Sequence, residues 1–360
     1  MGKLRTSLCL LLLGALIPAA IVARAHLPVD VQPLIEAKYG GWAGALRLWV
    51  CEGWPPGSGS AAGWLNRCIA SFEKRHPGVY VQPEVVDAGA VRDLGSDGIL
   101  PPDLVLFPPG VLETGDMLLP VAGDDRATPV LRGGYLWVYN PERLPGIPAD
   151  WREAAIPPDE PFRRWGAAVL ALSTGQAEEA ETPPAGEIDL GLETFSPVAD
   201  AWRDFVNGEA PAMPVTQREV RRLQALDDQG RGPSWRLAGW AGPMFTDQVL
   251  YLGLVDRGDP GREALCRAFA DHLRSDDCQG QLCRAGAFAV TGVSSGYSAG
   301  DPLAIMDAAL RAGEVGMAPP FGTAWQQAVD GIVREFIKNN ADPTALWPRI
   351  QAALGQISEH

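Results

Sequence analysis

Short apolar runs alternate with segments of helical periodicity in the first part of the chain, and this alternation strongly constrains the fold. Residues 46–50 (LRLWV) predict a buried strand. Leu65, Cys68, Ile69 and Phe72 then recur at helical spacing, with Ser58 or Ser60 as candidate N-cap. The segment HPGVYVQ (76–82) ends that helix and begins a second strand. Strands separated by helices favour βαβ units, so the sequence predicts an α/β fold with a largely parallel sheet.

The pattern continues with two further apolar strands and a helical final third. The strands are PPDLVLFPPG (101–110) and GGYLWVYN (133–140). Asp259-Pro260 places a capping residue before a proline at the first helical position, and Gly286 ends that helical region. Residues 325–337 predict the clearest amphipathic helix, and Asp342-Pro343 predicts the start of the last helix.

Length and charge limit the classes of protein that fit. The chain has 360 residues, which suits two lobes better than one small domain. Its formal net charge is −14. Nucleic-acid binding requires clustered lysine and arginine, so this charge argues against a nucleic-acid partner.

The first 25 residues have the pattern of an export signal. Lys3 and Arg5 precede the apolar stretch Leu8–Ala23, and Ala23-Arg24-Ala25 fits the small-x-small cleavage pattern. An uncleaved N-terminal anchor is the alternative. Residues 26–41 are expected to be a linker. We therefore expect an exported protein, located at the cell surface, in the periplasm or outside the cell.

The cysteines and the missing motifs argue against catalysis. Cleavage would leave five cysteines, an odd number: Cys51, Cys68, Cys266, Cys278 and Cys283. A disulfide bridge among the last three is one alternative, but buried structural thiols are the preferred interpretation. The sequence has no CxxC, HExxH, GxSxG, P-loop or GxGxxG after a strand. A catalytic pair of carboxylates is still an alternative, but the sequence predicts that the protein is not an enzyme and has no cofactor and no metal.

Six stretches in this order resemble the extracellular solute-binding proteins of ABC importers, a family that includes carbohydrate-binding members. They are WLNRCIASFEKRHPGVYVQPEVV (64–86), PPDLVLFPPGVLETGDMLLPV (101–121), GGYLWVYNPERLPGIPADW (133–151), FVNGEAPAMPV (205–215), FADHLRSDDCQGQLCRAGAFAVTG (269–292) and AWQQAVDGIVREFIKNNADPTALWPRIQAAL (324–354). The chain departs from the family pattern after AMPV, where TQREVRRL replaces the usual Gly-Pro-aromatic turn. This departure removes a common platform for sugar stacking.

The resemblance implies a two-lobe, type II fold like that of the periplasmic binding proteins, with a ligand cleft between lobes joined by crossing hinge strands. One lobe would comprise residues 42–131 plus 241–315, and the other 132–240 plus 316–360. The protein would be a monomeric receptor that closes on a sugar or oligosaccharide and delivers it to a membrane permease. A receptor for a small anion or other polar solute, and an exported sensor coupled to a membrane kinase, are the alternatives. A secreted hydrolase is disfavoured.

The resemblance also places candidate ligand contacts in the first lobe. Glu52 would accept hydrogen bonds, Trp54 would stack on an apolar sugar face, and Ser58 would donate from a helix N-terminus. Packing of Trp54 and capping by Ser58 are the simpler alternatives. Phe107, at the end of the third strand, would face the cleft, or else belong to the core.

Further candidates follow from the second lobe and the return crossing. Thr216, Gln217 and Arg218 occupy a position that often lines the site, and Arg218 would suit an anionic ligand. A solvated surface arginine is the alternative for Arg218. Trp240 (or Trp235) would form a wall of the site or pack at the hinge. Trp325 would contact the ligand, although it is also in register with the buried face of its helix.

Overall fold

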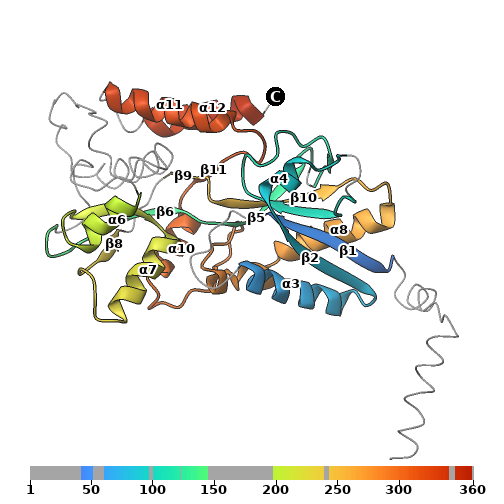
Figure 1. Ribbon diagram of the computed structural model, residues 1–360, viewed down its shortest axis with the longest axis horizontal. Coiled ribbons are helices and arrows are strands. Elements are labelled where there is room, and N and C mark those ends of the chain that lie inside the picture. Colours follow the sequence, from blue (N-terminus) through green and yellow to red (C-terminus); the bar gives the residue numbers. More distant parts are fainter. Residues whose placement is uncertain are drawn as a thin grey trace, which may run out of the picture.

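The computed structural model describes residues 42–51, 61–96, 100–121, 123–144, 198–238, 243–339 and 345–358. These residues form a mixed α/β structure with a six-stranded, a three-stranded and a two-stranded sheet. Figure 1 shows the six-stranded sheet with α3 (Ala61–Arg75) and α8 (Pro260–Leu273) on the right, and the three-stranded sheet with α6 (Val198–Val206) and α7 (Gln217–Asp227) on the left. Within these ranges, no helix combines the length and the apolarity needed to cross a membrane.

The six-stranded sheet has the order β2-β1-β3-β10-β4, and β5 also pairs with β10. Its strands are β1 (Gly44–Cys51), β2 (Val79–Val86), β3 (Leu104–Phe107), β4 (Leu118–Leu119), β5 (Ala127–Arg132) and β10 (Val249–Val255). β1 runs parallel to β2 and β3, whereas β10 runs antiparallel to β3, β4 and β5. Five of the six strands therefore run in one direction and β10 alone is reversed, but three of the five strand pairings are antiparallel. The prediction of a largely parallel sheet is thus correct for the strand directions and wrong for most of the pairings. The reason is that the chain reaches β10 from the strands of the three-stranded sheet and not through a crossover helix of the six-stranded sheet.

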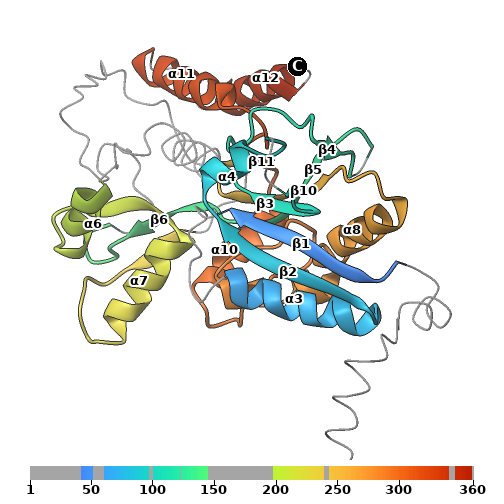
Figure 2. The same ribbon diagram turned by 45° about the vertical axis from the view of Figure 1, so that its right-hand side comes forward.

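Side-chain alternation along these strands builds a core on each face of the sheet. One face is covered by α3 (Ala61–Arg75), α8 (Pro260–Leu273), α9 (Asp276–Gln279) and the 3-10 helix η3 (Leu282–Ala285). Leu48, Leu106 and Leu252 point to this face. Trp49, Phe107 and Tyr251 point to the opposite face, which α4 (Ala88–Arg92) covers. Figure 2 shows α3 lying along β1 and β2.

The three-stranded sheet is antiparallel, in the order β7-β6-β8. It consists of β6 (Tyr135–Tyr139), β7 (Ala212–Thr216) and β8 (Arg236–Ala238). Three helices share its core: α6 (Val198–Val206), α7 (Gln217–Asp227) and α10 (Leu303–Ala312). The residues of α10 that pack here are Leu303, Met306 and Leu310.

The last elements form a separate layer. β9 (Met244–Thr246) pairs in parallel with β11 (Val315–Met317). Helices α11 (Ala324–Lys338) and α12 (Leu346–Ser358) pack together and on Phe245 and Ala318. Both helices lie along the top of Figure 1.

Two predicted helix ends are confirmed in detail. The Asp259 carboxylate accepts hydrogen bonds from the amides of Gly261 (3.0 Å) and Arg262 (3.2 Å), with Pro260 in the first turn. Gly286 ends η3 in the left-handed conformation, with φ at 62°. The predicted cap at Asp342-Pro343 and the apolar stretch Leu8–Ala23 lie outside the described residues.

Candidate functional site

The chain passes from the six-stranded to the three-stranded sheet through two consecutive glycines. Gly133 and Gly134 separate the end of β5 from the start of β6. The Gly133 amide donates to the Gln248 carbonyl at 2.6 Å. A Cβ on Gly133 would lie 2.5 Å from Nε2 and 2.8 Å from Oε1 of Gln217. Glycine is favoured here because any side chain would displace the Gln217 amide from the backbone.

Two glutamine side chains hold this junction together. Gln217 is the first residue of α7 and is fully buried. Its Oε1 accepts from the Gly134 amide at 3.3 Å, and its Nε2 donates to Oε1 of Gln248 at 3.1 Å. Gln248 lies in the turn between β9 and β10 and is half-buried. The pair therefore links a helix on the three-stranded sheet to a turn at the edge of the six-stranded sheet.

A carboxylate lies beside these amides. The Tyr135 hydroxyl donates to Oδ1 of Asp247 at 2.5 Å, and Asp247 is half-buried. Thr246, the preceding residue, donates from its hydroxyl to the Gly133 carbonyl at 3.3 Å. We define Tyr135, Gln217, Asp247 and Gln248 as the junction cluster. A half-buried carboxylate and amides offer acceptors and donors of the kind that recognise hydroxyl groups.

The N-terminus of α7 is closed by a capping box. The Glu219 carboxylate accepts from the Thr216 amide (2.8 Å) and from the Thr216 hydroxyl (2.6 Å). Both residues are buried, so the Thr216 hydroxyl already serves the helix. Arg218 follows Gln217 on the same first turn and has an exposed side chain. The three predicted residues thus lie at the start of one helix but differ in environment. Thr216 caps the helix, Gln217 is buried in the junction, and Arg218 is exposed.

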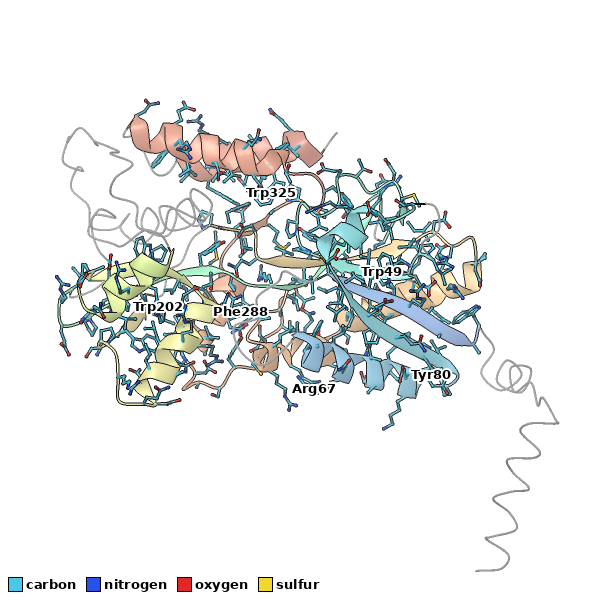
Figure 3. All side chains as sticks on the ribbon, viewed as in Figure 1. Trp49, Arg67, Tyr80, Trp202, Phe288 and Trp325 are labelled. Carbon is cyan, nitrogen blue, oxygen red and sulfur yellow. The ribbon has the colours of Figure 1, made fainter. Side chains whose placement is uncertain are left out.

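Arg132 lies directly before the two glycines, and its hydrogen bonds hold the end of β5 in place. It is the last residue of β5, is 7% exposed, and donates from its guanidinium to the Leu310 carbonyl at 2.9 Å. Its backbone exchanges two hydrogen bonds with Phe288, which Figure 3 places near the centre of the molecule. Burial lowers the pKa of Arg132 to about 10, and Asp307 opposes that shift, so the side chain stays cationic at neutral pH.

Phe107 lies in the core of the six-stranded sheet. It has no exposed surface, and its ring lies 6.3 Å from Tyr251 and 6.1 Å from Phe321. The segment after it pairs with the segment before α11, because the Gly110 amide donates to the Pro320 carbonyl at 3.1 Å. Phe321 is half-buried above Phe107. In this conformation the environment of Phe107 matches the core alternative.

Trp325 is similarly enclosed. It is 1% exposed and packs 6.1 Å from Phe245, in the core that α11 and α12 share. Figure 3 shows it on the side of α11 that faces the rest of the protein. Glu52, Trp54, Ser58 and Trp240 lie outside the described residues, and so their roles stay predictions. Cys51 and Phe107 end neighbouring parallel strands.

Sequence reasoning did not single out Tyr135, Asp247 or Gln248. The available signals were the paired glycines before an apolar strand and the polar triplet Thr-Asp-Gln (246–248) between two apolar strands. Within the described ranges, no group of three histidine, cysteine or acidic side chains is arranged to hold a metal ion.

Comparison with known proteins supports the fold. No protein-family model matches this sequence, and no curated protein matches it. Among solved structures, the chain is similar to the maltodextrin-binding protein MalE1 from L. casei BL23, determined without ligand, with 13% sequence identity and a TM-score of 0.55. The match covers 88% of this chain and 99% of that chain. The protein therefore has a mixed α/β fold like that of a maltodextrin-binding protein.

Proposed function

We propose that this protein is an extracytoplasmic solute-binding receptor, whose ligand is a sugar or oligosaccharide bound between two α/β lobes. The observation that carries the proposal is the fold match, which extends over nearly the whole length of a maltodextrin-binding protein. The position of the junction cluster between two sheets supports it, because binding proteins place ligands where domains meet.

The chemistry of the junction cluster fits a neutral, hydroxyl-rich ligand. Asp247 offers carboxylate oxygens, and Gln248 offers an amide, on two consecutive half-buried residues. Sugar hydroxyls both donate and accept, so mixed groups of this kind suit them. The segment from Glu52 to Ser58 would add Trp54 as a stacking surface from the edge where β1 and β3 end.

The crossing segments suit closure by a hinge. The proposed lobes are residues 42–131 plus 241–315 and residues 132–240 plus 316–360. Gly133 and Gly134 would form one crossing, and the segment between β8 and β9 another. Helix α10, assigned here to the first lobe by sequence, contacts the core of the three-stranded sheet. This contact favours moving the boundary of the second lobe to include α10.

Delivery to a membrane permease and export complete the proposal. The basic start at Lys3 and Arg5, the apolar stretch and the Ala23-Arg24-Ala25 site support export. The receptor would act as a monomer, with no catalytic step and no cofactor.

A thermal-shift screen followed by calorimetry tests this function. Maltodextrins, other sugars, amino acids and inorganic anions would each be added to the purified protein. A ligand present at 100 times its dissociation constant stabilises the folded state by about 2.7 kcal/mol, which gives a readable shift. Stabilisation by a sugar is expected; stabilisation by anions alone would replace the sugar with the anionic alternative, and turnover of a glycoside would overturn the receptor proposal.

Two charge variants separate these ligands. Asp247→Asn should weaken sugar binding at least tenfold, whereas Asp271→Asn, at an exposed helical position, should not. Arg218→Ala should abolish binding only if the ligand is an anion, with the exposed Arg231→Ala as its control. Unfolding curves for each variant show whether a loss of binding reflects a loss of folded protein.

A further inference from the structure

Two cysteines from distant parts of the sequence meet inside the core of the six-stranded sheet. Cys68 lies on α3 and Cys278 on α9, with exposures of 3% and 2%. The two helices are joined at this point by the Trp64 indole, whose Nε1 donates to the Cys278 carbonyl at 2.8 Å across 214 residues of sequence. The contact is therefore part of the packed core and not a chance surface approach.

One nitrogen of His272 contacts both cysteines. Nε2 of His272 lies 3.0 Å from the Cys68 carbonyl oxygen and 3.5 Å from Sγ of Cys278. The same nitrogen lies 2.7 Å from the Ser71 hydroxyl. His272 therefore contacts the backbone of Cys68 and the sulfur of Cys278, so the two cysteines belong to one buried cluster beside a group that can accept a proton. A hydrogen bond between the two thiols is also the largest cause of the opposite shifts in their pKa values.

The pKa values of the two thiols are shifted in opposite directions. The hydrogen bond from Cys68, its largest cause, lowers the pKa of Cys278. The same hydrogen bond and burial raise the pKa of Cys68. In the folded protein, Cys278 is therefore the thiol that ionises before Cys68 as pH rises.

The other described cysteines have different surroundings. Cys51 faces the opposite side of the sheet, in the core that contains Trp49 and Phe107. Cys266 lies on α8, where burial raises the pKa of its thiol to about 12. Cys283 is half-buried and close to Gly296. Sequence spacing alone left open a bridge among Cys266, Cys278 and Cys283, whereas the fold places Cys278 in one buried cluster with Cys68.

We propose that Cys68 and Cys278 form a disulfide bond in the oxidised protein, and that this bond ties α9 to α3. The inference does not depend on the ligand. It requires an oxidising environment, which the proposed export would supply.

The oxidant is a small-molecule or protein disulfide, and the exchange is balanced. One of the two cysteine thiols loses its proton, attacks one sulfur of the oxidant as a thiolate, forms a mixed disulfide and releases the first thiolate. The thiolate of the other cysteine then attacks the protein sulfur of the mixed disulfide, forms the internal disulfide and releases the second thiolate. The protein loses two electrons and two protons, and the oxidant is reduced to two thiols.

Burial determines when the bond forms and how long it lasts. Both sulfur atoms are shielded by α3, α8 and α9 in the folded state. Exchange with the oxidant must therefore take place before α9, a helix of four residues, docks on α3. Once formed, the bond should resist reductants until the protein unfolds.

Thiol counting by mass spectrometry tests the proposal. The purified chain is unfolded, reduced and refolded in a buffer of oxidised and reduced glutathione, and then alkylated with iodoacetamide under denaturing conditions. Two fewer alkyl groups than in the fully reduced sample are expected, together with one proteolytic product that joins the peptides of Cys68 and Cys278. Alkylation of every cysteine, or a bridge to any other cysteine, would overturn the proposal.

Single substitutions provide the matched controls. Cys68→Ser and Cys278→Ser should each restore alkylation of the remaining partner, whereas Cys266→Ser, on the same core face, should leave the bridge intact. The wild-type thiol count decides the question even if a serine variant fails to fold. Because this readout is a covalent mass, it is independent of whether the protein binds any sugar.

Discussion

Replacing Gly133 by alanine should destabilise the protein through the junction cluster. The new methyl group would lie 2.5 Å from Nε2 and 2.8 Å from Oε1 of Gln217, and 2.7 Å from Oε1 of Gln248. These atoms are the ends of side chains, so they can move aside. Movement breaks the Gly134–Gln217 hydrogen bond (3.3 Å) and the Gln217–Gln248 hydrogen bond (3.1 Å).

The size of the effect follows from burial. Gln217 has no exposed surface, so water cannot replace the lost partners. Each buried group left unsatisfied costs about 1–3 kcal/mol. Alanine also restricts the unfolded chain, and this effect stabilises the folded state by about 0.4–1 kcal/mol. The free energy of unfolding should therefore fall by about 1–3 kcal/mol, since the two amides recover part of their bonding after they move.

Urea denaturation of Gly133→Ala measures this free energy by linear extrapolation. Gly292→Ala is the matched control, because a Cβ at Gly292 meets no atom within 4 Å. The cause is tested by a double-mutant cycle with Gln217→Ala: once the amide is removed, alanine at position 133 should cost almost nothing. A loss equal to that of the control, or additive losses in the cycle, would refute the explanation.

Three other substitutions test the packing and the pH response of the molecule. Thr216→Ala removes the capping box with Glu219 and should lower the free energy of unfolding in urea by about 1 kcal/mol. Phe107→Ala should lower it by about 3–5 kcal/mol, since the ring is fully buried between Tyr251 and Phe321; a loss below about 1 kcal/mol would argue for an open site there. Burial lowers the pKa of His272, so the unfolded chain takes up a proton first as pH falls through about 6.5. Stability should therefore decrease from pH 7.5 to 5.5, and His272→Gln should flatten that decrease in urea titrations at each pH.

The sequence predicted only part of the candidate site. Thr216, Gln217 and Arg218 were predicted as a group, and they do begin α7 next to the crossing. Their separate environments were not predictable, because burial of Gln217 depends on Gln248, which is 31 residues away. Asp247 and Tyr135 were missed for the same reason, since their hydrogen bond joins residues 112 positions apart.

The sequence by itself determined the local elements. Apolar runs specified β1, β3 and β6, helical spacing specified α3, α8 and α11, and the Asp259 cap and the turn at Gly286 followed from residue type. These features depend on neighbours within one or two turns, so periodicity and capping chemistry are sufficient. Tertiary structure alone decided that β10 runs antiparallel, that Gln217 meets Gln248, and that Cys68 and Cys278 both contact His272. Each of these contacts joins segments whose separation along the chain carries no local signal, and only packing of both segments against a common core brings them together.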